Sequence, residues 1–85
     1  KTKAQVIGED HNETVDGNKD LEVGKNYTGR IRKKLSFQAG DEIELVCGKS
    51  KITLSSNGTI AVNGQKIMEV GDKLISMKSD KIEMN

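Results

Sequence analysis

The sequence predicts an all-β fold, an intertwined triple-stranded β-helix in which three chains form a trimeric β-prism built from octad repeats. The main observation is a period of eight, in which the same position of six successive octads is apolar and glycines recur near the joints. A fixed period is the signature of a repeat architecture. Within the octads, apolar residues also recur two apart, which places them on one face of a strand. The positions of the eight-residue period are Ile7, Val15, Val23, Ile31, Ala39 and Cys47.

The composition adds a third observation, because it leaves a single chain with little material for a core. The chain has 85 residues, of which 33% are hydrophobic and 2% aromatic, and Cys47 is the only cysteine. A chain of this length buries only about 60% of its unfolded surface when it folds alone. No disulfide can compensate, so we expect oligomerisation to complete the core. Basic and acidic residues nearly balance at a net charge of +1, which does not favour a nucleic-acid partner.

The order of elements along the chain follows from the octads. Residues 1–10 are expected to be a lead-in from a missing N-terminal part, since the chain begins with Lys, and residues 11–85 to be the β-helical domain. From His11 to Gly48 the octads run without a gap, and each contributes a short strand and a corner. Glycine with neighbouring Asn, Asp or Lys suits such corners. Caps and the apolar spacing of helices are absent, and so is proline, which would interrupt strand pairing.

After Gly48 the apolar frame shifts by one residue, and we attribute the shift to a small insertion near residues 49–51. Two Asn-Gly pairs follow, at 57–58 and 63–64. Asn-Gly is typical of tight hairpins, but the persistent period of eight favours corners at both places. The residues predicted to line the core are Val15, Leu21, Val23, Ile31, Phe37, Leu45, Cys47, Ile52, Leu54, Ile60, Val62, Met68 and Val70.

Two architectures fit this pattern. A single chain could coil as a solenoid, with three octads in each coil, or three chains could wrap around a common axis and contribute one face each per layer. The period alone does not separate them. The thin core of a single chain favours three chains.

The octads HNETVDGN and KDLEVGKN, followed by YTG, resemble the C-terminal β-helix of VgrG, the spike protein of bacterial type VI secretion. The stretch AGDEIELVCGKSKITLSSNGTIAVNGQKI resembles the segment after the octads in that family, and the plan is similar to phage tail cell-puncturing needles. The resemblance runs from about His11 to the end of the chain. The chain departs from the family pattern in that only Val15-Asp16-Gly17 keeps the Val-x-Gly spacing.

The resemblance implies a homotrimeric structural needle that a contracting sheath pushes through a target membrane, with transient membrane contact. It implies assembly in the bacterial cytoplasm, followed by secretion or delivery into a target cell. It also implies a PAAR-type tip protein or an effector at the C-terminal end. The last layer of strands would expose unpaired backbone groups, on which a cap could add. We assign tip binding to Ile82, Glu83, Met84 and Asn85.

No residue pattern indicates catalysis, a cofactor or a metal. His11 has no second ligand at a suitable spacing, Ser55 and Ser56 have no triad partners, and Gly48-Lys49-Ser50 lacks the rest of a phosphate loop. Glu13 takes a position that leucine holds in later octads, and the sequence leaves open whether it faces inward. We interpret the remaining candidates as a basic but solvated shaft face, at Arg30, Arg32, Lys33 and Lys34, and as core fillers, at Cys47, Met68, Met77 and Met84.

Two other functions compete with the spike. The chain could be a monomeric β-solenoid, serving as the shaft or binding module of an adhesin or a phage tail fibre. Such a module is expected to show aromatic or polar ladders on an outer face, and this sequence shows almost none. The chain could also come from a phage-type lytic spike whose catalytic domain lies elsewhere, in which case this segment is not itself an enzyme.

Overall fold

The structure is a computed structural model that describes residues 7–83, and the chain divides into two units, Lys1–Lys34 and Leu35–Asn85. The described residues form strands and extended chain, and no helix occurs among them. The expected all-β class is therefore confirmed. The strands are β1 (Glu42–Cys47), β2 (Ser50–Ser55) and β3 (Ile60–Asn63), all in the second unit.

Residues 7–34 of the first unit are extended chain that bends at regular intervals. The bends lie at residues 8–9, 16–17, 24–25 and 32–33, so they recur every eight residues at the predicted octad joints. Glycine stands at the first three bends, and Arg32 and Lys33 occupy the fourth. The octad period therefore persists through a joint that has no glycine. The predicted lead-in at residues 1–10 remains a prediction.

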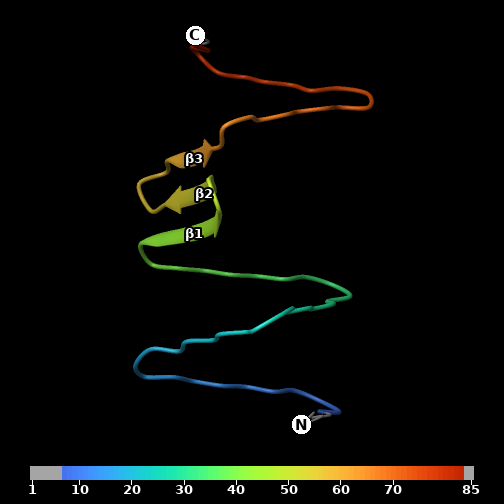
Figure 1. Cartoon of the computed structure of the whole chain (residues 1–85), viewed down its shortest axis with the longest axis vertical. Helices are drawn as coiled ribbons and strands as arrows, with labels where there is room; N and C mark the ends of the chain where they lie inside the picture. Colours follow the sequence, from blue (N-terminus) through green and yellow to red (C-terminus); the bar gives the residue numbers. More distant parts are fainter. Residues whose placement is uncertain (1–6, 84–85) are drawn as a thin grey trace. The chain divides into compact units, whose positions relative to one another are not determined.

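The second unit continues the period with a bend at residues 40–41 and then folds into a small antiparallel sheet in the order β1-β2-β3 (Figure 1). In its central register Leu45 of β1 lies opposite Ile52 of β2, which lies opposite Val62 of β3. Strands β1 and β3 form the two edges. The Ser56 amide donates a hydrogen bond to the Asp41 carbonyl at 2.9 Å, which ties the second hairpin loop to the start of β1.

The turn between β1 and β2 corrects one expectation from the sequence. Residues 48 and 49 form a two-residue hairpin loop that places Cys47 opposite Ser50. Gly48 has a φ of 57° and Lys49 has no positive φ, which is the pattern of a type II′ turn. Since residues 47 and 50 then face the same side, the apolar positions change from odd to even numbers. The frame shift after Gly48 is therefore a tight hairpin, and the predicted insertion near residues 49–51 is wrong.

The turn between β2 and β3 is a second hairpin, so the corner expected at Asn57-Gly58 is also wrong. The Asn57 side-chain oxygen accepts a hydrogen bond from the Thr59 amide at 3.0 Å, and Gly58 has a φ of 94°. The Gly58 amide donates to the Ser55 carbonyl at 3.0 Å, and the Ser55 amide donates to the Thr59 carbonyl at 2.9 Å. The local chemistry of Asn-Gly prevails here over the long-range period. At Asn63-Gly64 the chain leaves β3 and bends at residues 65–66, as expected for a corner.

Residues 64–83 return to extended chain with bends at 65–66, 72–73 and 80. Residues 64–83 make no backbone hydrogen bond with one another, and neither do residues 7–34. The strands expected in these octads are therefore present only as extended segments without partners. A strand is stabilised by the backbone of a neighbour, and neither of these stretches supplies one to itself. Among residues 7–83 no side chain is buried.

Candidate functional site

The candidate site is one face of the β1–β3 sheet. Directly opposed residues of an antiparallel pair point to the same side, and successive residues of a strand alternate sides. The register therefore assigns eight residues to a single face, and all except Ser50 are apolar. This surface, called the apolar face below, consists of Ile43, Leu45, Cys47, Ser50, Ile52, Leu54, Ile60 and Val62.

The opposite face of the same sheet is mostly polar. Lys51 and Glu44 form an ion pair across β1 and β2 with their charged atoms 3.0 Å apart. Thr53, Ser55 and Ala61 are half-buried on this side. The sheet is therefore amphipathic, with its charges on one side and all of its bulky hydrophobic residues except Val46 on the other.

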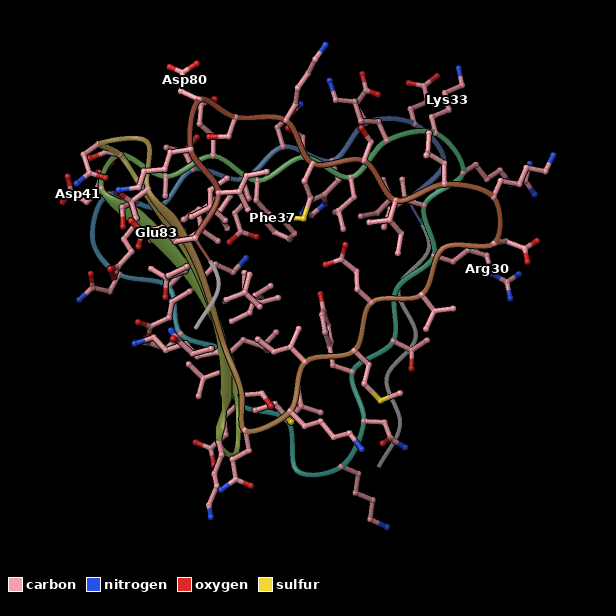
Figure 2. The ribbon with its side chains drawn as sticks, turned by 90° about the horizontal axis from the view of Figure 1, so that it is seen from above. Arg30, Lys33, Phe37, Asp41, Asp80 and Glu83 are labelled. Atoms are coloured by element: carbon pink, nitrogen blue, oxygen red, sulfur yellow. The ribbon has the colours of Figure 1, made fainter. Side chains whose placement is uncertain are left out.

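The apolar face is open to solvent in the single chain. Leu45 is 61% exposed and Ile60 is 68% exposed, although both would be expected in a protein core. Beside the face, Phe37, Ala39, Ile43 and Leu45 contribute to the lining of an open hollow of about 300 Å³. In Figure 2 Phe37 lies on the inner side of the ribbon and Asp41 on its outer side. The exposed apolar surface thus continues from the sheet onto the segment before β1.

The structure brings together six of the residues predicted to line the core, and places Phe37 beside them. Sequence reasoning missed Ile43, although it lies two residues before Leu45 and pairs with Leu54. The other predicted core residues lie on extended segments, where Val70 is 88% exposed. The burial of these residues in an assembly remains a prediction. The six on the apolar face are Leu45, Cys47, Ile52, Leu54, Ile60 and Val62, and the six on extended segments are Val15, Leu21, Val23, Ile31, Met68 and Val70.

Glu13 is the centre of a small charged cluster in the first unit. The Lys19 ammonium donates a hydrogen bond to one Glu13 carboxylate oxygen, and His11 Nε2 lies 3.9 Å from the other. The hydrogen bond and the positive charge of Lys19 lower the pKa of Glu13 below its ordinary value of 4.5, and His11 adds a smaller effect. Each of the three side chains remains about half exposed. The cluster therefore holds a surface carboxylate in its charged form and does not form an enclosed binding site.

The other polar candidates do not assemble into a reactive site. Within residues 7–83 no group of three or more His, Cys, Asp or Glu side chains could hold a metal ion. Cys47 is exposed on the apolar face of the single chain, so its expected role as a buried filler depends on a partner. Arg30 and Lys33 point outward from the ribbon in Figure 2, and Arg32 and Lys34 are also exposed.

Of the residues assigned to tip binding, Ile82 and Glu83 lie at the end of the described chain. A local turn precedes them, in which the Ser79 hydroxyl donates to the Lys81 carbonyl at 2.9 Å and accepts from the Lys81 amide at 3.2 Å. Lys81 also forms an ion pair with Glu83 at 2.9 Å, and Ile82 is 49% exposed. Met84 and Asn85 lie outside the described residues.

Among the described residues, no helix is long and apolar enough to cross a membrane. Comparison of the chain with models of protein families, with curated proteins and with solved structures found no match.

Proposed function

We propose that this chain is the β-helical needle of a VgrG-like spike of type VI secretion, a stiff homotrimer that punctures target membranes and presents a tip protein or effector at its C-terminal end. One observation carries the proposal. Extended segments of equal length are separated by bends every eight residues, and the backbone groups of residues 7–34 have no partners among themselves. This arrangement suits a chain that winds with other chains and is incomplete alone.

The amount of exposed surface supports an obligate assembly. The chain exposes 9936 Å² to solvent. A compact folded protein of 9.3 kDa exposes about 5,000 Å². A standard interface covers about 800 Å² on each partner, whereas obligate assemblies bury several times more. The surplus surface of this chain is therefore of the size that an interwound oligomer covers.

The pattern of strand pairing favours three chains over a single-chain solenoid. In a solenoid, segments one coil apart stack directly and form parallel ladders. Within residues 35–83 the paired strands are β1 with β2 and β2 with β3, and both pairs are antiparallel. Segments of this unit that lie three octads apart form no ladder. Interwound chains would instead place strands of other copies between them.

The proposed assembly accounts for mechanical strength. Each extended segment would receive backbone hydrogen bonds from strands of the other two copies, leaving open edges only at the ends of the prism. Pulling out one chain would then break its ladders with both neighbours. The charged residues between the apolar positions, such as Glu22 and Glu44, would face solvent and keep the shaft soluble.

The C-terminal end supplies the test of cargo presentation. The last layer would expose unpaired strand edges on which a PAAR-type tip protein could stack. Deletion of residues 82–85 is expected to abolish retention of a PAAR-type protein on the immobilised chain, while the mass of the needle in solution stays unchanged. The matched control is a Lys81→Gln variant, which removes the Lys81–Glu83 ion pair and keeps the chain length. Unchanged retention after the deletion, with the oligomer intact, would refute the assignment of the tip.

A further inference from the structure

We infer that the apolar face of the β1–β3 sheet is a self-association surface, on which each copy supplies one complete face of the prism and the apolar faces of three copies meet at the axis. The inference rests on the proposed trimer and specifies how its subunits are arranged at residues 42–63. In the octads, each layer of the proposed prism contains one strand from every chain, and these three strands lie on three different faces. In this segment a single chain would form three successive layers of the same face.

Within residues 35–83 no segment covers this face, since every residue of the face except Ile43 is exposed. The extended segment after β3 is itself open to solvent, with Met68 73% exposed and Met77 65% exposed. The segment before β1 extends the apolar surface through Phe37 and leaves a hollow beside it. A contiguous apolar surface that is exposed to solvent marks a binding surface.

A further copy of the chain is a chemically suitable partner for the apolar face. The apolar face has no ionisable side chain apart from the Cys47 thiol, and the charges of the sheet lie on the other side, where Glu44 and Lys51 neutralise each other. A charged partner would gain no ion pair there and would lose hydration. A second apolar face is neutral in the same way, and every copy carries one. The surplus exposed area of the chain also requires a cover far larger than one small ligand provides.

The edges of the sheet limit how other copies can contact this segment. The two hairpins fill both sides of β2 with strands of the same chain, so β2 needs no backbone partner from another copy. Only the outer edges of β1 and β3 remain for strands above and below. Away from these two edges the copies must therefore meet through side chains, because the backbone of β2 is paired on both sides. The apolar face is the surface of the sheet that can make such a contact.

The test uses two neighbouring residues with equal exposure in the single chain. Leu45 lies on the apolar face and Val46 on the polar face, and each is 61% exposed. In the whole chain with Cys47→Ala, we would compare Leu45→Cys with Val46→Cys. The mass of each variant in solution is measured by light scattering. The reactivity of its thiol is measured with a maleimide reagent. Cross-linking is measured by oxidation followed by gel electrophoresis without reductant.

We expect both variants to have the mass of three chains. The thiol at position 45 should react about tenfold or more slowly than the thiol at position 46, because labelling requires local opening of the assembly. Oxidation should link two chains of the Leu45→Cys trimer and none of the Val46→Cys trimer.

Three chains with equal labelling of both positions would overturn this inference and leave the proposed needle standing. The mass of one chain for the unaltered protein and for both variants would overturn the inference together with the proposed function. If Leu45→Cys alone loses the trimer, the same comparison is made with the native thiol at Cys47 in the unaltered chain. Labelling of Cys47 at the rate found for the chain in denaturant would then overturn the inference.

Discussion

Gly48 shows how one residue directs the path of the whole sheet. Its φ of 57° lies in the left-handed region, which side chains with a Cβ disfavour. With this residue in place, the chain reverses in two residues, and the apolar positions of β2 fall on the same side as those of β1. The amphipathic character of the sheet therefore depends on the conformation of a single glycine.

A Gly48→Ala substitution is expected to destabilise the protein by about 1 kcal/mol per chain, since a left-handed backbone costs that much for a residue with a Cβ. Gly40→Ala is the matched control, because Gly40 has no positive φ and a Cβ there would meet no atom within 4 Å. Gly48→Asn should recover part of the loss, since Asn tolerates this conformation. Denaturant unfolding followed by circular dichroism measures all three variants. Equal losses of stability in Gly40→Ala and Gly48→Ala would contradict the hairpin between β1 and β2.

The ion pair of Glu13 with Lys19 predicts how the stability of the fold depends on pH. Lys19 lowers the pKa of the Glu13 carboxyl, so the folded protein holds the charged form more strongly than the unfolded chain does. The stabilising contribution is present above the unfolded value near 4.5 and is lost as the pH falls through the lower folded value. Because the groups are exposed to solvent, the effect is small and screened by salt.

The Lys19→Gln variant should raise the pKa of Glu13 toward its ordinary value, as measured by carboxyl NMR titration. Lys25→Gln, which changes a lysine outside the cluster, should leave the Glu13 titration where it is in the unaltered chain. A Glu13 titration that is the same with and without Lys19 would mean that the ion pair does not form in solution.

At the scale of elements, the extended octads and the sheet differ in how far one chain can complete them. Strand β2 has hydrogen-bonded neighbours on both sides within the chain. The segment around Leu21 and Val23 has none within residues 7–34. If three chains interwind, both kinds of segment should be equally protected in the assembled protein.

Hydrogen exchange followed by mass spectrometry separates these cases. We expect amides of residues 18–23 to exchange slowly in the assembled protein, at rates close to those of β2, because strands of other copies bond them. In a single chain the same amides would exchange as freely as an unfolded peptide, while β2 would retain some protection. Fast exchange at residues 18–23 in a sample that has the mass of three chains would contradict interwinding of the octads.

The elements also show which parts of the fold were accessible from the sequence. The period of eight and the alternation around Leu45 predicted extended chain and the joints up to residue 40, and the structure has both. Six of the residues predicted to line the core share the apolar face, and their burial in an assembly remains a prediction. The two hairpins depart from the repeat because local turn chemistry at Gly48 and Asn57-Gly58 prevails there over the period of eight. Pairing of the octads could not be tested in a single chain, since their backbone partners would have to come from other copies.

For the whole molecule, we propose that one chain is an incomplete structure. No side chain of residues 7–83 is buried, and within residues 35–83 no segment covers the apolar face of the sheet. A sequence that alternates apolar and polar residues this regularly, yet leaves the apolar ones in water, is expected to associate with copies of itself. The proposed function as a needle would depend on this association, because a single unpaired chain would have no stiffness.

The most direct measurement is the mass of the protein in solution, by light scattering after gel filtration. One chain has a mass of 9.3 kDa. For the proposed trimer we expect three times that value, about 28 kDa, together with an elongated hydrodynamic profile. A species of 9.3 kDa with a β-type circular dichroism spectrum would contradict the trimer and leave the single-chain solenoid as the better description.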